Sequence, residues 1–223
     1  MSMKKITDGV FKINGKIATK NLDQGKKVYG EKLVKKDKVE YRFWNPYKSK
    51  PSAAFQKGLQ DFPVKKGKEV LYLGVGDGTT ASHFSDIIRD TGIIIGVDIA
   101  QKAFENFLEL CENRRNLIPV LADANEPEEY EEYIPSEGVD VVYQDIAQKE
   151  QTRILLKNVD KFLKKDGLFV FMVKSRSIDV TKDPKEIFDL QLDELRKNGC
   201  EIIEFKRLDP FEKDHAMIIG KKN

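Results

Sequence analysis

The stretch Val70-Leu71-Tyr72-Leu73-Gly74-Val75-Gly76-Asp77-Gly78 decides the fold of this 223-residue chain. A short apolar run leads directly into a turn with glycine at every second position, and residues 79–90 then continue at helical spacing. Glycine lets a backbone turn tightly and approach a ligand where a Cβ atom would clash. The stretch therefore predicts a first parallel strand, a ligand-binding turn and the helix that leads back across the sheet.

Apolar runs alternate with amphipathic segments through the rest of the chain. Further runs lie at residues 93–97, 117–121, 139–143 and 168–173. Helices are expected at residues 101–113, 149–164 and 184–198, with a short acidic helix after residue 123. This alternation is typical of a parallel sheet covered on both faces, a doubly wound α/β fold. The final runs, 201–205 and 216–219, have no long helix between them and should close the sheet as an antiparallel pair. In the helix 101–113 we expect one buried face, formed by Ala103, Phe104, Phe107, Leu108 and Cys111.

The first 50 residues have a different pattern. Asn14-Gly15 separates two short alternating runs, which is a strong hairpin signal because both turn positions tolerate positive φ. More strand is expected at residues 27–29 and 39–44. We interpret residues 1–50 as a small antiparallel β domain and residues 51–223 as the larger α/β domain, which begins with a short helix near Ser52.

Composition and charge exclude several classes of protein. The formal net charge is +2, with 40% hydrophobic and 34% charged residues, so nothing global demands a polyanionic partner. No apolar run approaches the roughly 20 residues that span a bilayer, and the N-terminus lacks a secretory signal. Cys111 and Cys200 are far apart and outside any CxxC pattern, which indicates reduced thiols and no zinc site. We expect a soluble intracellular protein with no metal centre and no membrane partner.

Carboxylates end the next two predicted strands. Asp98 lies about twenty residues beyond the glycines, where a carboxylate can accept both ribose hydroxyls of a nucleoside. Asp123, followed by Ala124, ends the third strand, where a side chain can reach an adenine amino group. Either aspartate alone is better explained as a helix cap or turn former. Together with a G-x-G-x-G turn, they favour S-adenosylmethionine over NAD and a Rossmann-like class I methyltransferase sheet.

Two further residues at strand ends are candidates for the chemistry. Asp145 follows the fourth run and Lys174 ends the fifth, so both lie beside the predicted crevice. Lys174 has two explanations of about equal weight. It is either a surface lysine whose aliphatic part packs on apolar residues or a catalytic lysine. Lys50 and His215 indicate little by themselves, and we expect His83 to be a packing or surface residue.

Several motifs are distinctive when taken together. They are Tyr41-Arg42-Phe43-Trp44-Asn45-Pro46 with Ser49-Lys50, Val70-Leu71-Tyr72-Leu73-Gly74 with Gly78-Thr79-Thr80, Asp123-Ala124, Asp145-Ile146-Ala147-Gln148, Lys174-Ser175-Arg176-Ser177-Ile178-Asp179 and Asp214-His215-Ala216. With these motifs the chain resembles the fibrillarin family, in its short archaeal form, along essentially its whole length. Asp98 departs from the glutamate usual in the family, and Gly76-Asp77-Gly78 replaces a more frequent Ala-Ser-Gly. Both changes are conservative enough to keep the cofactor assignment.

The resemblance implies 2′-O-methylation of ribose in ribosomal and transfer RNA, with S-adenosylmethionine as the methyl donor. Together with the glycines of the turn, it places the cofactor contacts at Gly74, Gly76, Gly78, Thr79, Thr80, Asp98, Ile99, Asp123, Ala124, Asp145, Ile146, Ala147 and Gln148. It places the catalytic set at Lys50, Asp145, Lys174 and His215. The implied partners are a box C/D guide RNA, the substrate RNA, a Nop-domain scaffold protein and a kink-turn-binding ribosomal-type protein. In an archaeal cell, the implied location is the cytoplasm.

A ribose hydroxyl is a very weak acid, so methyl transfer to it needs a base near the transition state. We expect Lys174 to be this base, because an apolar strand and the like charge of Lys50 favour its neutral amine. Asp145 opposes that effect but orients the amine and the hydroxyl. Lys50 and His215 are expected to hold the ribose and its phosphate.

The remaining expectations concern RNA contacts outside the reacting centre. Candidates for phosphate contacts are Arg42, Lys48, Arg176 and Lys182, although each is equally well explained as ordinary surface. We expect Trp44 and Phe43 to pack the small domain onto the larger one rather than to stack on bases.

Three other functions are compatible with parts of the pattern. A small-molecule or protein methyltransferase shares the fold, but it rarely needs two lysines beside Asp145. A non-catalytic subunit that binds the cofactor only structurally has no need of all four polar positions. An NAD-dependent oxidoreductase shares the glycine-rich turn, and cofactor-binding assays would distinguish it.

Overall fold

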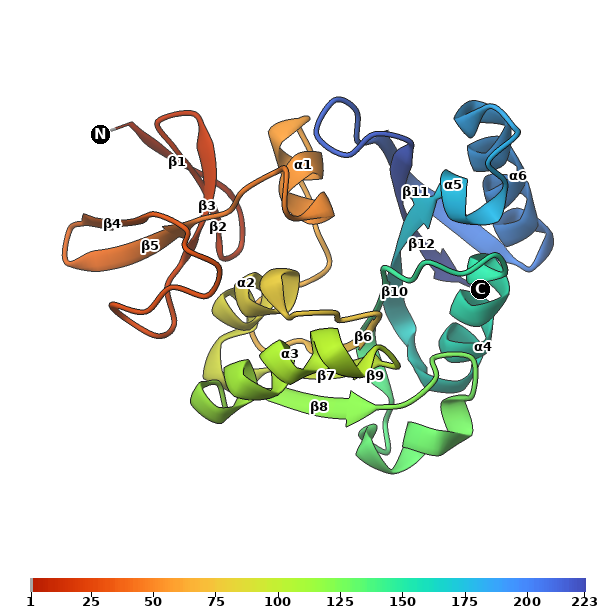
Figure 1. The fold of residues 1–223 in the computed structure, drawn as a ribbon, viewed down its shortest axis with the longest axis horizontal. Coiled ribbons are helices and arrows are strands. Elements are labelled where there is room, and N and C mark those ends of the chain that lie inside the picture. Colours follow the sequence, from red (N-terminus) through yellow and green to blue (C-terminus); the bar gives the residue numbers. More distant parts are fainter. Residues whose placement is uncertain (1) are drawn as a thin grey trace.

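The computed structural model describes residues 2–223, which form two sheets (Figure 1). The N-terminal sheet is antiparallel, with strand order β1–β2–β3–β5–β4. Its strands are β1 (Met3–Thr7), β2 (Val10–Ile13), β3 (Lys16–Lys20), β4 (Leu33–Lys36) and β5 (Val39–Phe43). Asn14 and Gly15 connect β2 to β3 with φ angles of 46° and 81°, which confirms the predicted hairpin turn.

The second sheet has seven strands in the order β11–β12–β10–β9–β6–β7–β8. It is parallel from β10 to β8, whereas β12 runs antiparallel to both of its neighbours. The strands are β6 (Glu69–Leu73), β7 (Ile93–Asp98), β8 (Leu117–Leu121), β9 (Val139–Gln144), β10 (Leu163–Lys174), β11 (Cys200–Arg207) and β12 (His215–Lys222). The predicted doubly wound sheet with an antiparallel closing pair is confirmed.

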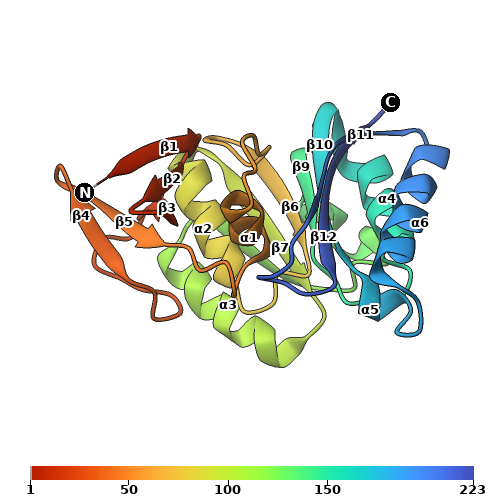
Figure 2. The same ribbon diagram turned by 90° about the horizontal axis from the view of Figure 1, so that it is seen from above.

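Helices cover both faces of this sheet, as Figure 2 shows. One face carries α1 (Lys50–Gln56), α2 (Thr79–Ile88) and α3 (Gln101–Asn113), and the other carries α4 (Gln151–Phe162) and α6 (Pro184–Lys197). Short segments are α5 (Ser175–Ile178) and the 3-10 turns η1 (Arg89–Thr91) and η2 (Pro127–Tyr133). Because strand side chains alternate, Val70 and Tyr72 enter the first core, and Leu71 and Leu73 enter the second. No described helix combines the length and apolar character needed to cross a membrane.

Two local predictions are wrong, and each has a physical reason. Residues 27–29 form no strand, because the main-chain N–H groups of Val28 and Tyr29 donate to the carboxylate of Glu31 instead of to a neighbouring strand. In α3, Phe104 and Phe107 are buried as expected, but Leu108 is 45% exposed because it falls on the solvent side of the helix.

Trp44 joins the two sheets. Its indole is buried, stacks on the His83 ring of α2 at 4.8 Å between centroids, and packs against Phe55 and Phe84. The expected packing role of Trp44 is therefore confirmed. Phe43 instead joins a small cluster under the N-terminal sheet, since its side chain points to the opposite face of β5.

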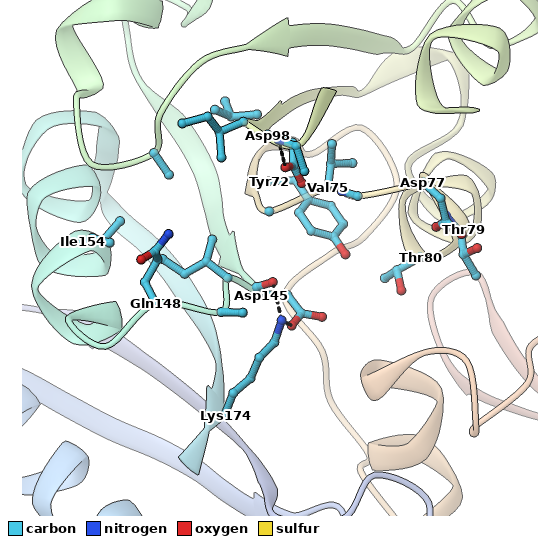
Figure 3. Close-up of a pocket in the computed structure, with 18 of the residues that line it drawn as sticks. Tyr72, Val75, Asp77, Thr79, Thr80, Asp98, Asp145, Gln148, Ile154 and Lys174 are labelled. Atoms are coloured by element: carbon cyan, nitrogen blue, oxygen red, sulfur yellow. Dashed lines mark hydrogen bonds and ion pairs between the residues drawn. The ribbon is translucent and has the colours of Figure 1, made fainter. Parts of the chain in front are cut away.

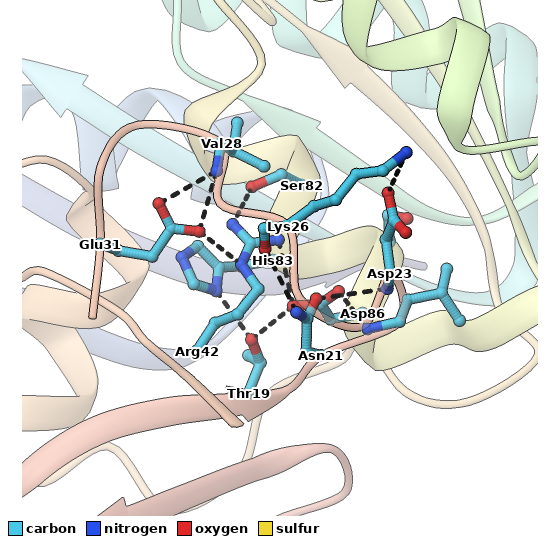
Figure 4. Close-up of polar contacts among 12 residues, drawn as sticks. Thr19, Asn21, Asp23, Lys26, Val28, Glu31, Arg42, Ser82, His83 and Asp86 are labelled. Atoms are coloured by element: carbon cyan, nitrogen blue, oxygen red, sulfur yellow. Dashed lines mark hydrogen bonds and ion pairs between the residues drawn. The ribbon is translucent and has the colours of Figure 1, made fainter. Parts of the chain in front are cut away.

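A buried ionic network joins the N-terminal sheet to α2 (Figure 4). Arg42 Nε lies 2.6 Å from Glu31 Oε1, and Arg42 Nη1 lies 3.3 Å from Asp86 Oδ2. Arg114 Nη1 approaches the other oxygen of Asp86 at 2.8 Å. Arg42 is therefore a structural residue and not the RNA contact that its charge suggested, because its side chain is fully buried.

The hydrogen bonds of His83 define its protonation. Thr19 gives its hydroxyl proton to Asp86, which can only accept, so the Thr19 oxygen receives a proton from His83 Nδ1 at 2.8 Å. His83 Nε2 is then an acceptor for the Tyr29 hydroxyl at 2.8 Å. Burial, reinforced by the positive charges of Arg42 and Arg114, lowers the pKa of His83 well below its usual range. The ring is thus a neutral packing residue, as predicted.

Candidate cofactor and catalytic site

The glycine-rich turn after β6 is shaped by close backbone contacts. At Gly74, which has φ of 80°, a Cβ atom would lie 2.7 Å from the carbonyl oxygen of Asp145. At Gly78 it would lie 2.7 Å from the Phe107 ring, so this glycine lets α2 and α3 pack closely. Gly76 has open space at the corresponding position. The turn therefore needs glycine at two of its positions for packing, and at the third it leaves room for a ligand.

A cavity of about 420 Å³ opens where β6, β7 and β9 end, next to this turn (Figure 3). It is lined by nearly all the residues predicted to bind the cofactor, namely Gly74, Gly76, Thr79, Thr80, Asp98, Ile99, Asp123, Ala124, Asp145, Ile146, Ala147 and Gln148. Lys174 also lines it. Of the predicted cofactor residues, only Gly78 is absent from this wall, because its role is the packing contact with Phe107.

Two of the aspartates that line the cavity, Asp98 and Asp123, are held by main-chain groups. Asp98 accepts from the N–H of Gly76 at 2.7 Å through one oxygen and from the N–H of Ala100 at 2.8 Å through the other. Asp123 accepts from the N–H of Asn125 at 2.8 Å, a local turn contact. Each carboxylate therefore has the turn-forming role that was the simpler explanation, and each has remaining lone pairs for a ligand.

The donor set of the cavity fits S-adenosylmethionine. Asp98 and Asp123 supply acceptors for ribose hydroxyls and an adenine amino group, and the 62% exposed side chain of Ile99 supplies an apolar contact for a flat ring. The open space beside Gly76 admits the amino-acid end of such a ligand close to the backbone.

Lys50, Asp145 and Lys174 form a cluster at the edge of the cavity, which we call the catalytic cluster. Lys50 Nζ lies 3.0 Å from Asp145 Oδ2, and Lys174 Nζ lies 2.8 Å from Asp145 Oδ1. Lys174 Nζ also donates to the main-chain oxygen of Asp145 at 2.9 Å. The residues come from the start of α1, the end of β9 and the end of β10, so only the fold brings them together.

Electrostatics keep the cluster charged at Asp145 and Lys50. Burial alone would raise the pKa of Asp145, but the two ammonium groups outweigh it and hold that pKa below its usual range. Burial alone would lower the pKa of Lys50, yet Asp145 and Glu212 together raise it. At neutral pH Asp145 is therefore a carboxylate and Lys50 an ammonium.

His215 lies beside this cluster but is not part of the cavity wall. It pairs with Lys174 in the β10–β12 register, and its Nδ1 lies 2.7 Å from the main-chain oxygen of Lys213. Burial and the charge of Lys50 lower the pKa of His215, so its ring is neutral at pH 7. Its Nδ1 then donates to Lys213, which leaves Nε2 available as an acceptor.

Sequence reasoning missed Tyr72 and Glu212 as residues of this region, and it predicted Lys48 only as a phosphate contact. Tyr72 was assigned only to the core strand, yet its hydroxyl points into the cavity between Asp145 and Thr80 in Figure 3. Lys48 also lines the cavity. Glu212, whose pKa is raised by burial, lies 3.9 Å from His215. Its position beside His215 in the sequence was the one available signal.

Comparison with known proteins agrees with this geometry. The family model described as fibrillarin matches residues 1–223. The chain belongs to the fibrillarin family. A relative from Methanococcus maripaludis named fibrillarin-like rRNA/tRNA 2′-O-methyltransferase is 46% identical over 223 residues, which is 98% of this chain and 96% of the relative.

Solved structures of the family share the whole fold. Fibrillarin from Methanococcus jannaschii superposes with a TM-score of 0.93 at 46% identity, covering 99% of this chain and 97% of that one. Aeropyrum pernix fibrillarin, solved with natively bound S-adenosylmethionine, has a TM-score of 0.88 at 43% identity and coverages of 99% and 98%. A fibrillarin solved in complex with Nop5p has a TM-score of 0.90 at 40% identity and coverages of 99% and 100%.

Proposed function

We propose that this chain is an S-adenosylmethionine-dependent RNA methyltransferase that modifies the ribose 2′-oxygen of ribosomal and transfer RNA. The observation that carries the proposal is the catalytic cluster: one carboxylate held between two amines at the wall of an adenosine-sized cavity. Oxygen methylation needs a proton acceptor beside an electrophilic methyl group, and this arrangement supplies one. The cofactor, when bound, supplies that methyl group.

The geometry of Lys174 supports it as the proton acceptor. Its Nζ has two neighbouring acceptors, the carboxylate and the main-chain oxygen of Asp145. Lys174 must first lose a proton to act as a base. Its neutral amine then keeps the hydrogen bond to the main-chain oxygen of Asp145 and has a lone pair free to take the proton of the ribose hydroxyl. Asp145 then stabilises the ammonium that forms, and it fixes the position of the amine during the transfer.

Lys50 and His215 are suited to hold the substrate. Lys50 stays an ammonium because of Asp145, so it can contact a phosphate or the ribose oxygen that develops negative charge. The neutral ring of His215 has its Nε2 available as an acceptor for a ribose hydroxyl. Glu212 lies near both residues, and its charge interacts with the positive charges of Lys50 and Lys174.

The proposal extends to a ribonucleoprotein particle. The fibrillarin solved with Nop5p supports a Nop-domain scaffold as partner. We further propose a box C/D guide RNA that pairs with the substrate, and a kink-turn-binding ribosomal-type protein, in the cytoplasm of an archaeal cell. A net charge of only +2 fits this arrangement, because base pairing selects the target and the protein needs only local phosphate contacts.

The test is transfer of tritiated methyl from S-adenosylmethionine to a target RNA. The assay compares the protein alone with the protein plus guide RNA and scaffold partners. We expect labelling at one ribose 2′-oxygen, dependent on the partners and on a guide matched to the site. Labelling of a base or a protein would assign the chain to another methyltransferase class. No labelling despite tight cofactor binding would indicate a non-catalytic subunit.

A further inference from the structure

A second cavity, of about 480 Å³, lies between the N-terminal sheet and the segment that leads into α1. Five of its lining residues are aromatic, namely Tyr29, Phe43, Trp44, Tyr47 and Phe211. Tyr47 is 65% exposed, and its ring meets Phe211 edge to face at 5.2 Å. An exposed aromatic side chain fixed at the mouth of a cavity is a surface on which a flat ring can stack.

The rim of this cavity carries unpaired positive charge. Lys16, Lys32 and Lys48 line it, all three side chains are exposed, and within residues 2–223 none of them forms a salt bridge. The carboxylate that lines the cavity belongs to Glu31, which already binds Arg42 and the main-chain N–H groups of the preceding residues. Lys48 lies 5.5 Å from the Tyr29 ring centre. The cavity therefore combines aromatic faces with free cations, the combination that binds single-stranded nucleic acid.

The cavity lies next to the proposed catalytic site. Lys48 lines both cavities, and Lys50, two residues further on, contacts Asp145. From the other side, Phe211 belongs to the loop that also carries Glu212 and leads to His215. An RNA strand with a ribose at Asp145 would therefore pass Lys48 on its way to the second cavity.

The wall also contains a polar atom that lacks a partner. The indole Nε1 of Trp44 is buried and has no hydrogen-bond acceptor within the part of the chain that the structure describes. An unsatisfied buried donor costs free energy. An acceptor on a bound base, reached by a small shift of the indole, would satisfy it.

We infer that this second cavity binds an unpaired nucleotide of the RNA strand that crosses the catalytic site, with its base against Tyr47 and Phe211 and its phosphates near Lys32 and Lys48. The inference rests on the proposed function for the identity of the strand. In the proposed particle this nucleotide flanks the segment that pairs with the guide, because a base must be unpaired to enter an aromatic cavity.

The chain has a single tryptophan, Trp44, so its fluorescence reports directly on this cavity. The experiment titrates the full-length protein with a six-nucleotide single-stranded RNA at low salt, and with an abasic chain of the same length. We expect saturable quenching by the RNA and at least fivefold weaker binding of the abasic chain. S-adenosylmethionine should not produce this signal, because Trp44 does not line the first cavity.

Variants distinguish stacking from unspecific charge. Tyr47→Ala should weaken RNA binding about tenfold, whereas Tyr133→Ala, which removes another exposed tyrosine far along the chain, should leave it unchanged. Lys32→Ala should weaken RNA binding and reduce the slope of log affinity against log salt concentration by about one. Lys4→Ala on β1 should change neither quantity.

The inference is overturned if the abasic chain binds as well as the RNA, if Tyr47→Ala behaves like Tyr133→Ala, or if Tyr47→Ala weakens capture of the scaffold protein and not of RNA. The methyl-transfer assay keeps the two proposals separate. Methylation by the wild-type particle without Trp44 quenching overturns only the second cavity's role. Quenching without methylation overturns only the proposed function.

Discussion

Asp86 and Asp145 each lie between two cations, but their surroundings differ. Asp86 lies between Arg42 and Arg114, and its side chain is fully buried at the junction of the two sheets. Asp145 lies between Lys50 and Lys174, and its side chain is 13% exposed at a cavity wall. The same charge pattern thus occurs both inside the protein and at the edge of a ligand site.

The two clusters differ in whether the protein itself supplies all the partners of the aspartate. We call the Asp86 cluster closed and the Asp145 cluster open. Asp86 also accepts from Thr19 and from the main-chain N–H of Leu22, so both its oxygens are fully used. Arginine suits that place because its fork reaches several partners and keeps its charge. Lysine suits the open cluster because a single amine can take up or release a proton when a substrate arrives.

The largest effect that we expect is on catalysis, from Asp145→Ala. Loss of the carboxylate removes the group that positions Lys174, and general acid–base contributions are about 10²–10⁴-fold. Single-turnover methyl transfer in the assembled particle measures this, with cofactor affinity measured separately by equilibrium dialysis. The control is Asp61→Ala, which changes an exposed aspartate that does not line the cavity. Activity within threefold of wild type for Asp145→Ala would falsify the catalytic cluster.

A substitution in the closed cluster, Asp86→Ala, should lower the free energy of unfolding. Asp86→Ala leaves two buried guanidinium groups without their shared partner, and breaking a buried pair costs about 3–5 kcal/mol. Urea unfolding followed by circular dichroism measures the loss. Asp61→Ala, at a 79% exposed aspartate, should change the free energy of unfolding by less than about 0.5 kcal/mol. Equal effects of the two substitutions would show that burial does not distinguish the clusters.

Arg42→Lys tests whether the closed cluster needs arginine and not merely a positive charge. Arg42 uses Nε for Glu31, Nη1 for Asp86 and Nη2 for Ser82, and a lysine cannot reach all three. Arg42→Lys should therefore lower the free energy of unfolding by about 1.5–3 kcal/mol through the lost charged hydrogen bonds. The same urea experiment measures it, with Lys16→Arg on the surface as the control. An unchanged urea midpoint for Arg42→Lys would contradict the proposed role of the three guanidinium donors.

The smallest effect is a pH dependence of stability at His83. Because its pKa is lowered in the folded protein, the unfolded chain binds the extra proton as the pH falls below about 6.5. Stability should then fall toward acid with a slope that approaches about 1.4 kcal/mol per pH unit. Unfolding at pH 7.5 and 5.5 measures this for wild type and for His83→Gln, whose dependence should be weaker. His215→Gln corrects for the second histidine, whose pKa is also lowered.

The sequence predicted the strands and helices of the larger sheet because their patterns are local. The apolar run at residues 139–143 is enough to predict a buried strand, and Asn14-Gly15 is enough to predict a hairpin turn. The strand predicted at residues 27–29 failed for the opposite reason. There the deciding partner is the Glu31 carboxylate, whose orientation depends on Arg42 from another strand.

The sequence by itself determined the alternation of the fold, the glycine turn and the carboxylates at strand ends, because each depends on neighbours along the chain. It predicted Asp145 and Lys174 from their strand-end positions, and it predicted the full catalytic set only through resemblance to a family. The tertiary structure decided that Arg42 is buried while Lys48 is free, and that Tyr72 and Glu212 lie at the site. It also placed Lys50, 95 residues away in sequence, against Asp145. Such choices depend on which distant elements meet, since burial and pairing set the energy of a charge more than its neighbours in sequence do.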